Sequence, residues 1–319
     1  EMSASLVGSE MCIRDRSIKG RALGKTRNFA WTAKASHFGR GGIAQAMTER
    51  ASRLTSSAGF SVLQTLLFSL PPPPPCCIIK KTLKRRCFRL RFLHLSDLHL
   101  GKRVCEFSML DDQRYILEEI LSLLDSTPVD GVLLAGDLYD KPVPPAEAVR
   151  LLDWFLTQLA ERRLPVFAIS GNHDSADRIA FGSALLQSSR VYVSPVFSGA
   201  PVPISLTDEY GTLDVYLLPF LKPAMVRHVW PDEPVESYND ALACVLRHCP
   251  LDPAHRSVLV AHQFAAGAAC CESEEVSVGG VDSVDASLFD AFDYVALGHL
   301  HTQKVGGDAV RYCGSPLKY

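Results

Sequence analysis

Residues that can bind metal ions follow five short apolar segments of the sequence, each at the point where the segment ends. The segments are 92–95, 132–135, 166–169, 258–261 and 294–297, and the residues that follow them are Asp97, His99, Asp137, Asn172, His262, His299 and His301. Carboxylate, imidazole and amide donors together suit Mn, Fe or Zn better than Ca. Seven such side chains exceed the needs of one ion and predict two ions about 3.5–4 Å apart that share a carboxylate, an arrangement that activates water for attack on a phosphoryl group.

The spacing of these residues favours a shared site. Asp97 and His99 are two residues apart, as are His299 and His301. Side chains two apart on an extended segment point to the same side, so each pair can serve one site. Glycines permit tight turns and close backbone approach, and they stand directly before Asp137, Asn172 and His299.

The apolar segments are predicted to be strands that are covered on both faces, as in a sheet flanked by helices. Strands are expected at 92–95, 132–135, 166–169, 215–218, 258–261 and 294–297, and helices at 110–124, 146–162, 177–187 and 238–247. Alternation of strands and helices indicates an α/β layer fold. Ligands of open α/β sheets bind outside the carboxyl ends of the strands, so the five strand ends are expected to converge on one site.

Each candidate ligand also has an ordinary structural interpretation. A lone Asp after a strand usually caps a helix or forms a turn, and Asn172 alone would be a turn residue. A lone His at a strand end is more often a hydrogen-bonded structural residue. The recurrence of such residues at five strand ends favours the metal site over these separate explanations. By contrast, we expect His94 to lie in the core, and His248 and His255 to lie on the surface.

Five sequence blocks resemble the signature of calcineurin-like metallophosphoesterases. They are SDLH at 96–99, GDLYD at 136–140, GNHD at 171–174, His262, and GHLH at 298–301. The resemblance implies a fold of two packed mixed β-sheets flanked by helices, a four-layer sandwich, over residues 91–319. It implies one metal bound by Asp97, His99, Asp137 and His301, and a second bound by Asp137, Asn172, His262 and His299. It also implies that His173 protonates the leaving oxygen and that Asp174 orients His173.

Longer segments are similar to one branch of this family, the bacterial SbcD-type nuclease subunits. The segments are 92–101, 136–140, 219–221, 296–301 and 311–316. This resemblance implies a manganese-dependent double-strand 3′-to-5′ exonuclease and single-strand endonuclease that acts in DNA recombination, replication and repair. It implies two Mn²⁺ ions, a homodimer of the nuclease subunit, and an SbcC-type coiled-coil ATPase as partner. The archaeal and eukaryotic branch tends to have His where Asp140 stands, so the role of Asp140 stays open.

Charge divides the chain near residue 90. Residues 1–90 carry 16 basic and 4 acidic side chains (+12), whereas residues 91–319 carry 17 basic and 31 acidic ones (−14). We expect residues 1–90 to be either an artefactual segment or a disordered basic tail that touches nucleic acid. The SbcD-type resemblance also predicts that the family's capping and ATPase-binding regions would follow Tyr319, where this sequence stops.

Cysteine usage and hydropathy indicate a cytoplasmic protein. The ten cysteines form no C-x-x-C pair and look like reduced thiols rather than a disulfide framework. The apolar run at 60–70 is too short for a membrane span, and its position deep in the chain argues against a signal peptide. No membrane association is therefore expected.

Two other functions compete with a DNA nuclease. One is a phosphodiesterase or phosphatase of the same superfamily that acts on a small substrate or a phosphoprotein. The other is an inactive scaffold, because folds of this kind also serve as interaction modules. The complete set of predicted ligands argues against the scaffold.

Overall fold

The computed structural model describes residues 67–69, 90–265, 283–301 and 309–319. The chain divides into two units, and the described part of the smaller one is Lys102–Ile116. The larger unit, Leu66–Gly101 with Leu117–Tyr319, holds both main sheets and all the predicted metal ligands. The expectation for residues 1–90 falls outside the described residues, apart from Leu90 and the strand β1 (Leu67–Ser69).

The first sheet has the strand order β1-β2-β5-β6-β7. Its other strands are β2 (Arg91–Leu95), β5 (Gly131–Ala135), β6 (Val166–Ile169) and β7 (Val191–Val193). The strands β2, β5, β6 and β7 are parallel, and β1 is antiparallel to β2. Every residue of β5 and β6 is buried, which explains why these segments are apolar without alternation.

The second sheet has the order β14-β13-β10-β9-β8. Its strands are β8 (Ile204–Asp208), β9 (Gly211–Leu218), β10 (Arg256–His262), β13 (Tyr294–Gly298) and β14 (Val310–Tyr312). All neighbours are parallel except β8, which forms an antiparallel pair with β9. Both sheets are thus mixed, with parallel strands at the centre.

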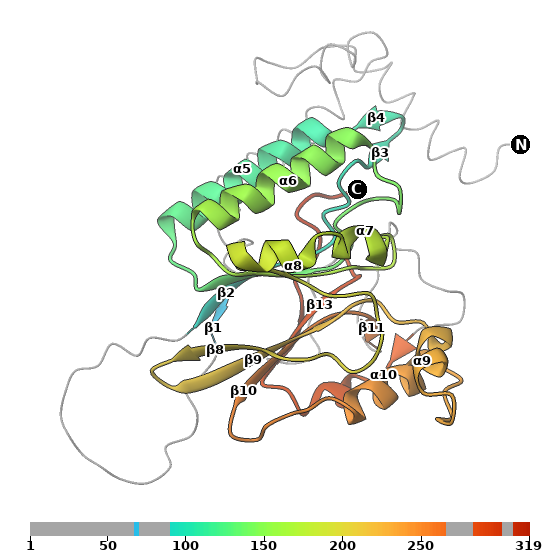
Figure 1. The fold of residues 1–319 in the computed structure, drawn as a ribbon. Helices are drawn as coiled ribbons and strands as arrows, with labels where there is room; N and C mark the ends of the chain where they lie inside the picture. Colours follow the sequence, from blue (N-terminus) through green and yellow to red (C-terminus); the bar gives the residue numbers. More distant parts are fainter. Residues whose placement is uncertain (1–66, 70–89, 266–282, 302–308) are drawn as a thin grey trace, which may run out of the picture. The chain divides into compact units, whose positions relative to one another are not determined.

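The two sheets pack face to face through a buried apolar layer. The first sheet contributes Phe92, Leu133, Ala135, Phe167 and Ile169, and the second contributes Leu213, Val215, Leu217, Val258, Val260, Tyr294 and Ala296. The opposite face of the second sheet packs on helices through a second apolar cluster that includes Leu242, Val245 and Phe289. This arrangement of sheets and flanking helices confirms the predicted fold class (Figure 1).

The helices form where apolar residues recur at helical spacing. In α6 (Ala146–Glu161), one face is buried through Leu151, Leu152, Phe155 and Leu159. The helix α10 (Tyr238–Arg247) begins at a capping box in which Ser237 and Asp240 bond reciprocally to each other's backbone N–H. The other long helix is α5 (Leu110–Ser126), and α9 (Pro223–Val229) begins with proline.

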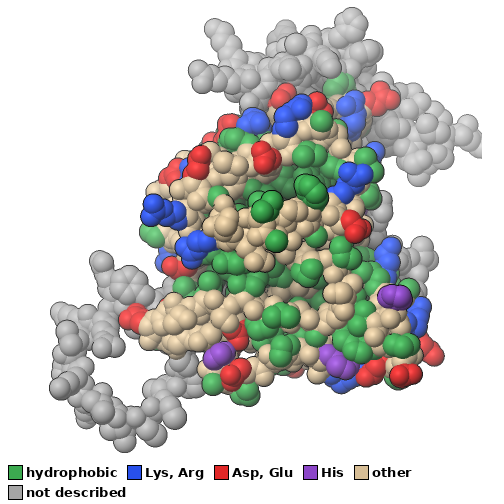
Figure 2. Space-filling model, viewed as in Figure 1, with side chains coloured by type: hydrophobic (Ala, Val, Ile, Leu, Met, Phe, Trp, Pro, Cys, Tyr) green, Lys and Arg blue, Asp and Glu red, His purple; other side chains and the backbone are tan. Residues whose placement is uncertain are grey.

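One predicted helix, 177–187, is wrong as a continuous element. The structure has α7 (Ala176–Ala180), then α8 (Ser183–Leu186) and the 3₁₀ turn η1 (Gln187–Ser189). The break falls at Gly182, whose φ of 73° lies in the left-handed region that ends helices. Phe181 and Leu185 beside this break are 84% and 80% exposed, and Figure 2 shows hydrophobic side chains over α7 and α8.

Short elements complete the described chain. They are β3 (Arg103–Val104), β4 (Phe107–Ser108), β11 (Phe264–Ala265), β12 (Ser283–Val284) and the 3₁₀ turn η2 (Ala286–Phe289). Within the described ranges, no helix has the length and apolar character needed to cross a lipid bilayer.

Candidate metal centre

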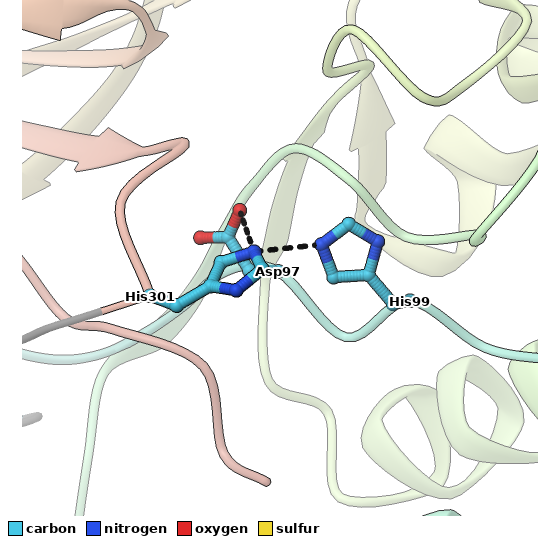
Figure 3. Close-up of side chains that lie close together, drawn as sticks. All are labelled: Asp97, His99 and His301. Atoms are coloured by element: carbon cyan, nitrogen blue, oxygen red, sulfur yellow. Dashed lines mark hydrogen bonds and ion pairs between the residues drawn. The ribbon is translucent and has the colours of Figure 1, made fainter. Parts of the chain in front are cut away.

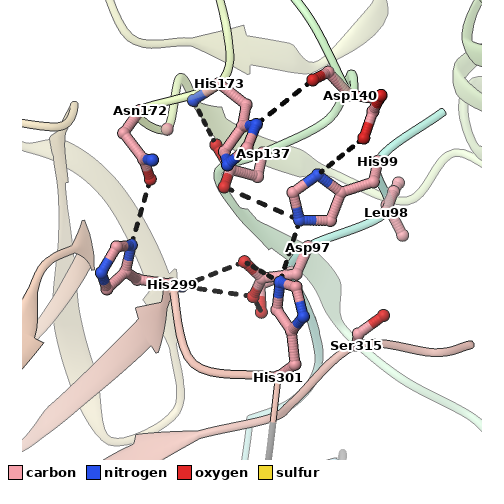
Figure 4. A network of polar contacts seen from close by, with 12 residues as sticks. Asp97, Leu98, His99, Asp137, Asp140, Asn172, His173, His299, His301 and Ser315 are labelled. Carbon is pink, nitrogen blue, oxygen red and sulfur yellow. Dashed lines mark hydrogen bonds and ion pairs between the residues drawn. The ribbon is translucent and has the colours of Figure 1, made fainter. Parts of the chain in front are cut away.

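The carboxyl ends of β2, β5, β6, β10 and β13 bring all seven predicted ligands into one network. Figure 4 shows six of them, and His262 joins the network through Asn172 and Asp137. The segments after β2 and β5 run side by side. The N–H of Asp97 donates to the carbonyl oxygen of Gly136 at 3.1 Å, and the N–H of His99 donates to that of Asp137 at 3.0 Å. The convergence expected from the strand ends is therefore what the fold produces.

The first group of donors is Asp97, His99 and His301 (Figure 3). One donor atom from each lies within 4.8 Å of the others. The Nε2 atoms of His99 and His301 are 3.0 Å apart, and Nε2 of His301 lies 3.9 Å from Oδ1 of Asp97. Asp97 and His99 are fully buried, so the group is shielded from bulk water.

The second group is built around Asn172. Its Oδ1 lies 3.0 Å from Nε2 of His262 and 3.0 Å from Nδ1 of His299. Phe220 packs on both rings, stacked on His299 at 6.4 Å between centroids and edge-on to His262 at 6.2 Å. These two imidazoles and the amide oxygen therefore face one another under an apolar cover.

Asp137 stands between the two groups. Its Oδ2 lies 3.2 Å from Nε2 of His262 and 3.8 Å from Nε2 of His99. Its Oδ1 accepts the backbone N–H of His173 at 2.9 Å. A carboxylate that faces a histidine of each group has the placement of a shared ligand.

The donor atoms fit cations better than they fit one another. Nδ1 of His262 must donate to the carbonyl oxygen of Ala135, 2.8 Å away, so Nε2 of the neutral ring carries a lone pair. That lone pair faces the oxygens of Asn172 and Asp137. Three acceptors in contact require a positive charge among them, and a metal ion supplies it for all three at once. A backbone carbonyl that fixes the other nitrogen is also typical of a metal-binding histidine.

Buried carboxylates create the same demand for positive charge. Asp97 and Asp137 are 0% and 2% exposed, and their ion-pair partners among the described residues are all histidines. Burial raises the pKa of Asp97 to about 7, with a smaller upward contribution from Asp137. Burial also opposes the charge of Asp137, but the imidazoles of His262 and His99 hold the pKa of Asp137 well below its ordinary value. Conversely, Asp137 raises the pKa of His262 to about 9 against the effect of burial.

Several ligands have a strained backbone. The φ angles of Asp97, His99, Asp137 and His299 are 54°, 42°, 50° and 97°, in the left-handed region that non-glycine residues rarely adopt. Such residues cost on the order of 1–3 kcal/mol each and persist where the surrounding structure holds them in place. The hydrogen bonds from the N–H of His299 to both carboxylate oxygens of Asp97, at 3.2 Å each, help to hold this geometry.

The predicted close approach at glycines is confirmed at all three positions, and a β-carbon on Gly136 would lie 2.5 Å from Nδ1 of His262. A β-carbon on Gly298 would overlap the carbonyl oxygen of Ala135 and would lie 2.7 Å from Nδ1 of His262. A β-carbon on Gly171 would overlap the carboxylate of Asp137. Larger residues at these positions would therefore push the strand ends apart.

His173 lies beside the donor groups, half-buried, with its ring edge-to-face against His99 at 4.8 Å between centroids. Its Nδ1 is 3.2 Å from the backbone carbonyl oxygen of Asp140, which can only accept. Nδ1 therefore carries a proton, and Nε2 is the nitrogen left to meet a substrate.

Asp174 contacts different atoms from those implied by the resemblance. Its carboxylate accepts the backbone N–H groups of Leu138, Tyr139 and Gly171 at 2.9–3.0 Å. It therefore holds the segments after β5 and β6 together. The ring contact of His173 is with the carbonyl oxygen of Asp140, and the carboxylate of Asp140 lies 3.9 Å from Nδ1 of His99.

Three residues around the site were not singled out from the sequence. Ser96 donates to the carboxylate of Asp97, and its Oγ is 3.0 Å from Sγ of the buried Cys313. The hydroxyl of Tyr319 donates to the carbonyl oxygen of Leu98, and its ring lies edge-on to His99 at 5.6 Å between centroids. All three lie beside candidate ligands, but none of them belongs to the groups of metal-binding atoms described above.

Comparison with known protein families agrees with this architecture. Residues 90–303 match the family model described as calcineurin-like phosphoesterase. Among solved structures, the chain is similar to TT1561 of Thermus thermophilus, with 14% sequence identity and a TM-score of 0.41. That match covers 70% of this chain and 89% of the other.

Proposed function

The chain belongs to the calcineurin-like phosphoesterase family, a family of metal-dependent hydrolases, and on that premise we propose that it is a DNA nuclease of the SbcD type. The proposed activities are double-strand 3′-to-5′ exonuclease and single-strand endonuclease, in recombination, replication and repair. The proposed metal is Mn²⁺, two ions per chain.

A hydrolytic function is supported above all by one observation: seven side chains that can bind metal ions lie close together at five strand ends. In the proposal, Asp97, His99, Asp137 and His301 hold one ion. Asp137, Asn172, His262 and His299 hold the other. When bound, the two ions polarise a phosphoryl oxygen and activate water for attack on phosphorus.

His173 supplies the proton that the reaction needs. Attack of water on phosphorus breaks the bond to the leaving oxygen, which would otherwise depart as an alkoxide. The protonated His173 ring can donate from Nε2 to that oxygen while Nδ1 stays bonded to the carbonyl of Asp140. The water proton that is released in the attack then balances the proton lost by His173.

DNA as substrate is supported by the sequence blocks that resemble SbcD-type subunits, above all 92–101 and 311–316. The same resemblance supports an SbcC-type ATPase partner and a homodimer. The cytoplasm as compartment is supported by the cysteines, because Cys105, Cys244, Cys249 and Cys313 are free thiols in the described structure.

A second candidate is a phosphodiesterase that acts on a small substrate. It is favoured by the net charge of −14 over residues 91–319, which opposes the approach of a polyanion. A small ester could reach the same metal centre without a basic surface.

The deciding experiment compares three substrates with purified chain and Mn²⁺. They are duplex DNA labelled at its 5′ ends, circular single-stranded DNA and a chromogenic phosphodiester, with Asp137→Ala as the inactive control. Stepwise shortening of the duplex together with opening of the circle would support the nuclease. Turnover of the small ester alone would favour the second candidate. No turnover of any substrate by protein with two bound ions would overturn both.

A further inference from the structure

A second group of metal-binding side chains lies away from the strand ends, beside helix α10. Glu233 lies in the segment between α9 and α10, Cys244 lies on α10, and His248 is the residue at the C-terminal cap of that helix. One donor atom from each of the three lies within 4.8 Å of the others. None of these residues belongs to the donor groups of the phosphoesterase centre.

The ring of His248 is already oriented for binding. Its Nδ1 lies 2.9 Å from the carbonyl oxygen of Cys244 and must donate to it, so Nε2 carries the lone pair. That is the pattern in which metal-binding histidines are usually held. Trp230 stacks on the imidazole at 4.5 Å between centroids and 17° between planes, which fixes the ring plane.

The carboxylate of Glu233 is held in a similar way. Its Oε2 accepts from Nη2 of Arg247 at 2.8 Å, whereas Oε1 points toward Nε2 of His248 from 4.0 Å. A separation of 4.0 Å is too long for a hydrogen bond, and it leaves room for a shared partner between the two atoms.

The thiol of Cys244 completes the group from the inside. Cys244 is fully buried, while the side chains of Glu233 and His248 are 31% and 38% exposed, so an ion can enter from solvent and meet the sulfur. Burial, and then the nearby Glu233 carboxylate, raise the pKa of the thiol. A divalent cation between them would reverse the effect of the carboxylate and favour the thiolate.

We propose that Glu233, Cys244 and His248 form a zinc site that is separate from the phosphoesterase centre. One thiolate, one imidazole and one carboxylate, with water as a fourth ligand, suit Zn²⁺, and the thiolate selects against Mn²⁺ and Mg²⁺. Small rotations of the two exposed side chains would bring their donors to about 2.0–2.3 Å from the ion. The site would tie the segment before α10 to the end of that helix. Its simplest rival is a surface cluster in which Arg247, Glu233 and His248 interact without a metal.

Co²⁺ in place of Zn²⁺ gives a direct test, because a thiolate bound to Co²⁺ produces a charge-transfer absorption in the near ultraviolet. The phosphoesterase centre has no cysteine ligand, so it does not contribute to this band. We expect the reduced full-length chain to show the band, and Asp137→Ala to keep it. Cys244→Ser should abolish it, and His248→Gln should weaken Co²⁺ binding by about 10-fold or more.

The matched control is Cys249→Ser, which removes the thiol next to His248 and should leave the band unchanged. Circular dichroism in the absence of metal shows whether each variant is folded. Zn²⁺ should displace Co²⁺ and erase the band in wild type. A band that is absent from the folded wild-type chain, or that survives in Cys244→Ser, would overturn the proposal. Neither result would bear on the proposed nuclease activity, because Asp137→Ala is expected to disrupt the phosphoesterase centre and to leave the group of Glu233, Cys244 and His248 unchanged.

Discussion

Asp137 faces a histidine of each donor group, with Oδ2 3.2 Å from Nε2 of His262 and 3.8 Å from Nε2 of His99. Asp137→Ala should therefore reduce bound Mn²⁺ from near two ions per chain to near zero. His301 belongs to the first group alone, so His301→Ala should leave close to one ion. Elemental analysis after gel filtration in Mn²⁺ measures both. Equal metal loss in the two variants would contradict a bridging role for Asp137.

In the proposed mechanism, His173 offers Nε2 to the substrate, because its Nδ1 is held by the carbonyl oxygen of Asp140. His173→Asn should keep the metal content and melting temperature of wild type, because the backbone N–H that bonds Asp137 remains. Cleavage should fall about 10²–10⁴-fold, the usual contribution of a general acid. A chromogenic ester with a good leaving group needs less protonation, so its hydrolysis should fall less. Equal losses on both esters would assign His173 another role.

The convergence of the seven candidate ligands could be predicted from the sequence, because each of them follows an apolar strand within a few residues. The sequence did not predict the roles of Ser96, Cys313 and Tyr319. Except for the bond between Ser96 and Asp97, their contacts join residues that are more than 200 positions from each other in the sequence. The contacts of Asp174 were not predicted either. Its sequence position suggests a partner for the neighbouring His173, but the fold places the backbone N–H groups of Leu138 and Tyr139 against it.

At the scale of elements, the site depends on how closely β13 and β10 approach β5. Gly298 ends β13 where a side chain would overlap the carbonyl oxygen of Ala135 at the end of β5. Gly298→Ala should destabilise the fold by about 1–3 kcal/mol, as overpacking does, and weaken metal binding through His299. Gly182→Ala is the control, because open space surrounds Gly182 and only its left-handed φ opposes a side chain. Denaturant unfolding and Mn²⁺ titration measure the two effects, and unchanged Mn²⁺ affinity in folded Gly298→Ala would contradict this account.

A charged pair links β9 to the turn before β10. Nδ1 of His255 lies 2.8 Å from the buried carboxylate of Asp214, which also accepts from Ser205 on β8 at 2.6 Å. The bond to Asp214 raises the pKa of His255 above its ordinary value. Stabilisation is therefore fully present below the unfolded pKa of about 6.5 and is lost as the pH rises through the folded pKa. His255→Gln should lower the free energy of unfolding more at about pH 5.5 than at about pH 8.5. A loss that does not change with pH would mean that the pair is uncharged.

The central strands were predictable because they are buried on both faces, as β6 shows by matching its predicted range residue for residue. The outer elements were not. In β8, half-buried and exposed positions alternate and no residue is buried, so its sequence lacks the continuous apolar run by which the central strands were predicted. The break at Gly182 depends on backbone conformation rather than on apolar spacing, which continues across it. Pairing of β1 with β2 joins part of the apolar run at 60–70, for which no strand was predicted, to the first sheet.

At the scale of the whole molecule, charge decides how a polyanion can bind. Residues 91–319 have a net charge of −14, and two divalent ions would return four charges, leaving −10. Acidic and basic side chains are both spread over the face drawn in Figure 2. Affinity for DNA comes largely from Lys and Arg that neutralise phosphates, so this part of the chain should bind duplex DNA weakly outside the metal centre.

The six basic residues at 80–89 are the densest positive segment of the chain, and they lie outside the described residues. Replacing all six by Gln in the full-length chain should therefore remove most of its affinity for duplex DNA. Each phosphate contact contributes a slope of about −0.9 to the dependence of log K on log salt, so the slope should flatten by up to about five. Replacing Lys141, Arg150 and Lys222, three exposed cations, is the control and should change affinity far less. Fluorescence anisotropy at low and moderate salt measures both variants.

Tight, strongly salt-dependent binding by the Gln variant would locate the DNA contacts within residues 91–319, in spite of their charge. Weak binding with unchanged hydrolysis of a chromogenic phosphodiester is the expected result, because that hydrolysis needs only the metal centre, whereas holding DNA needs positive charge from elsewhere.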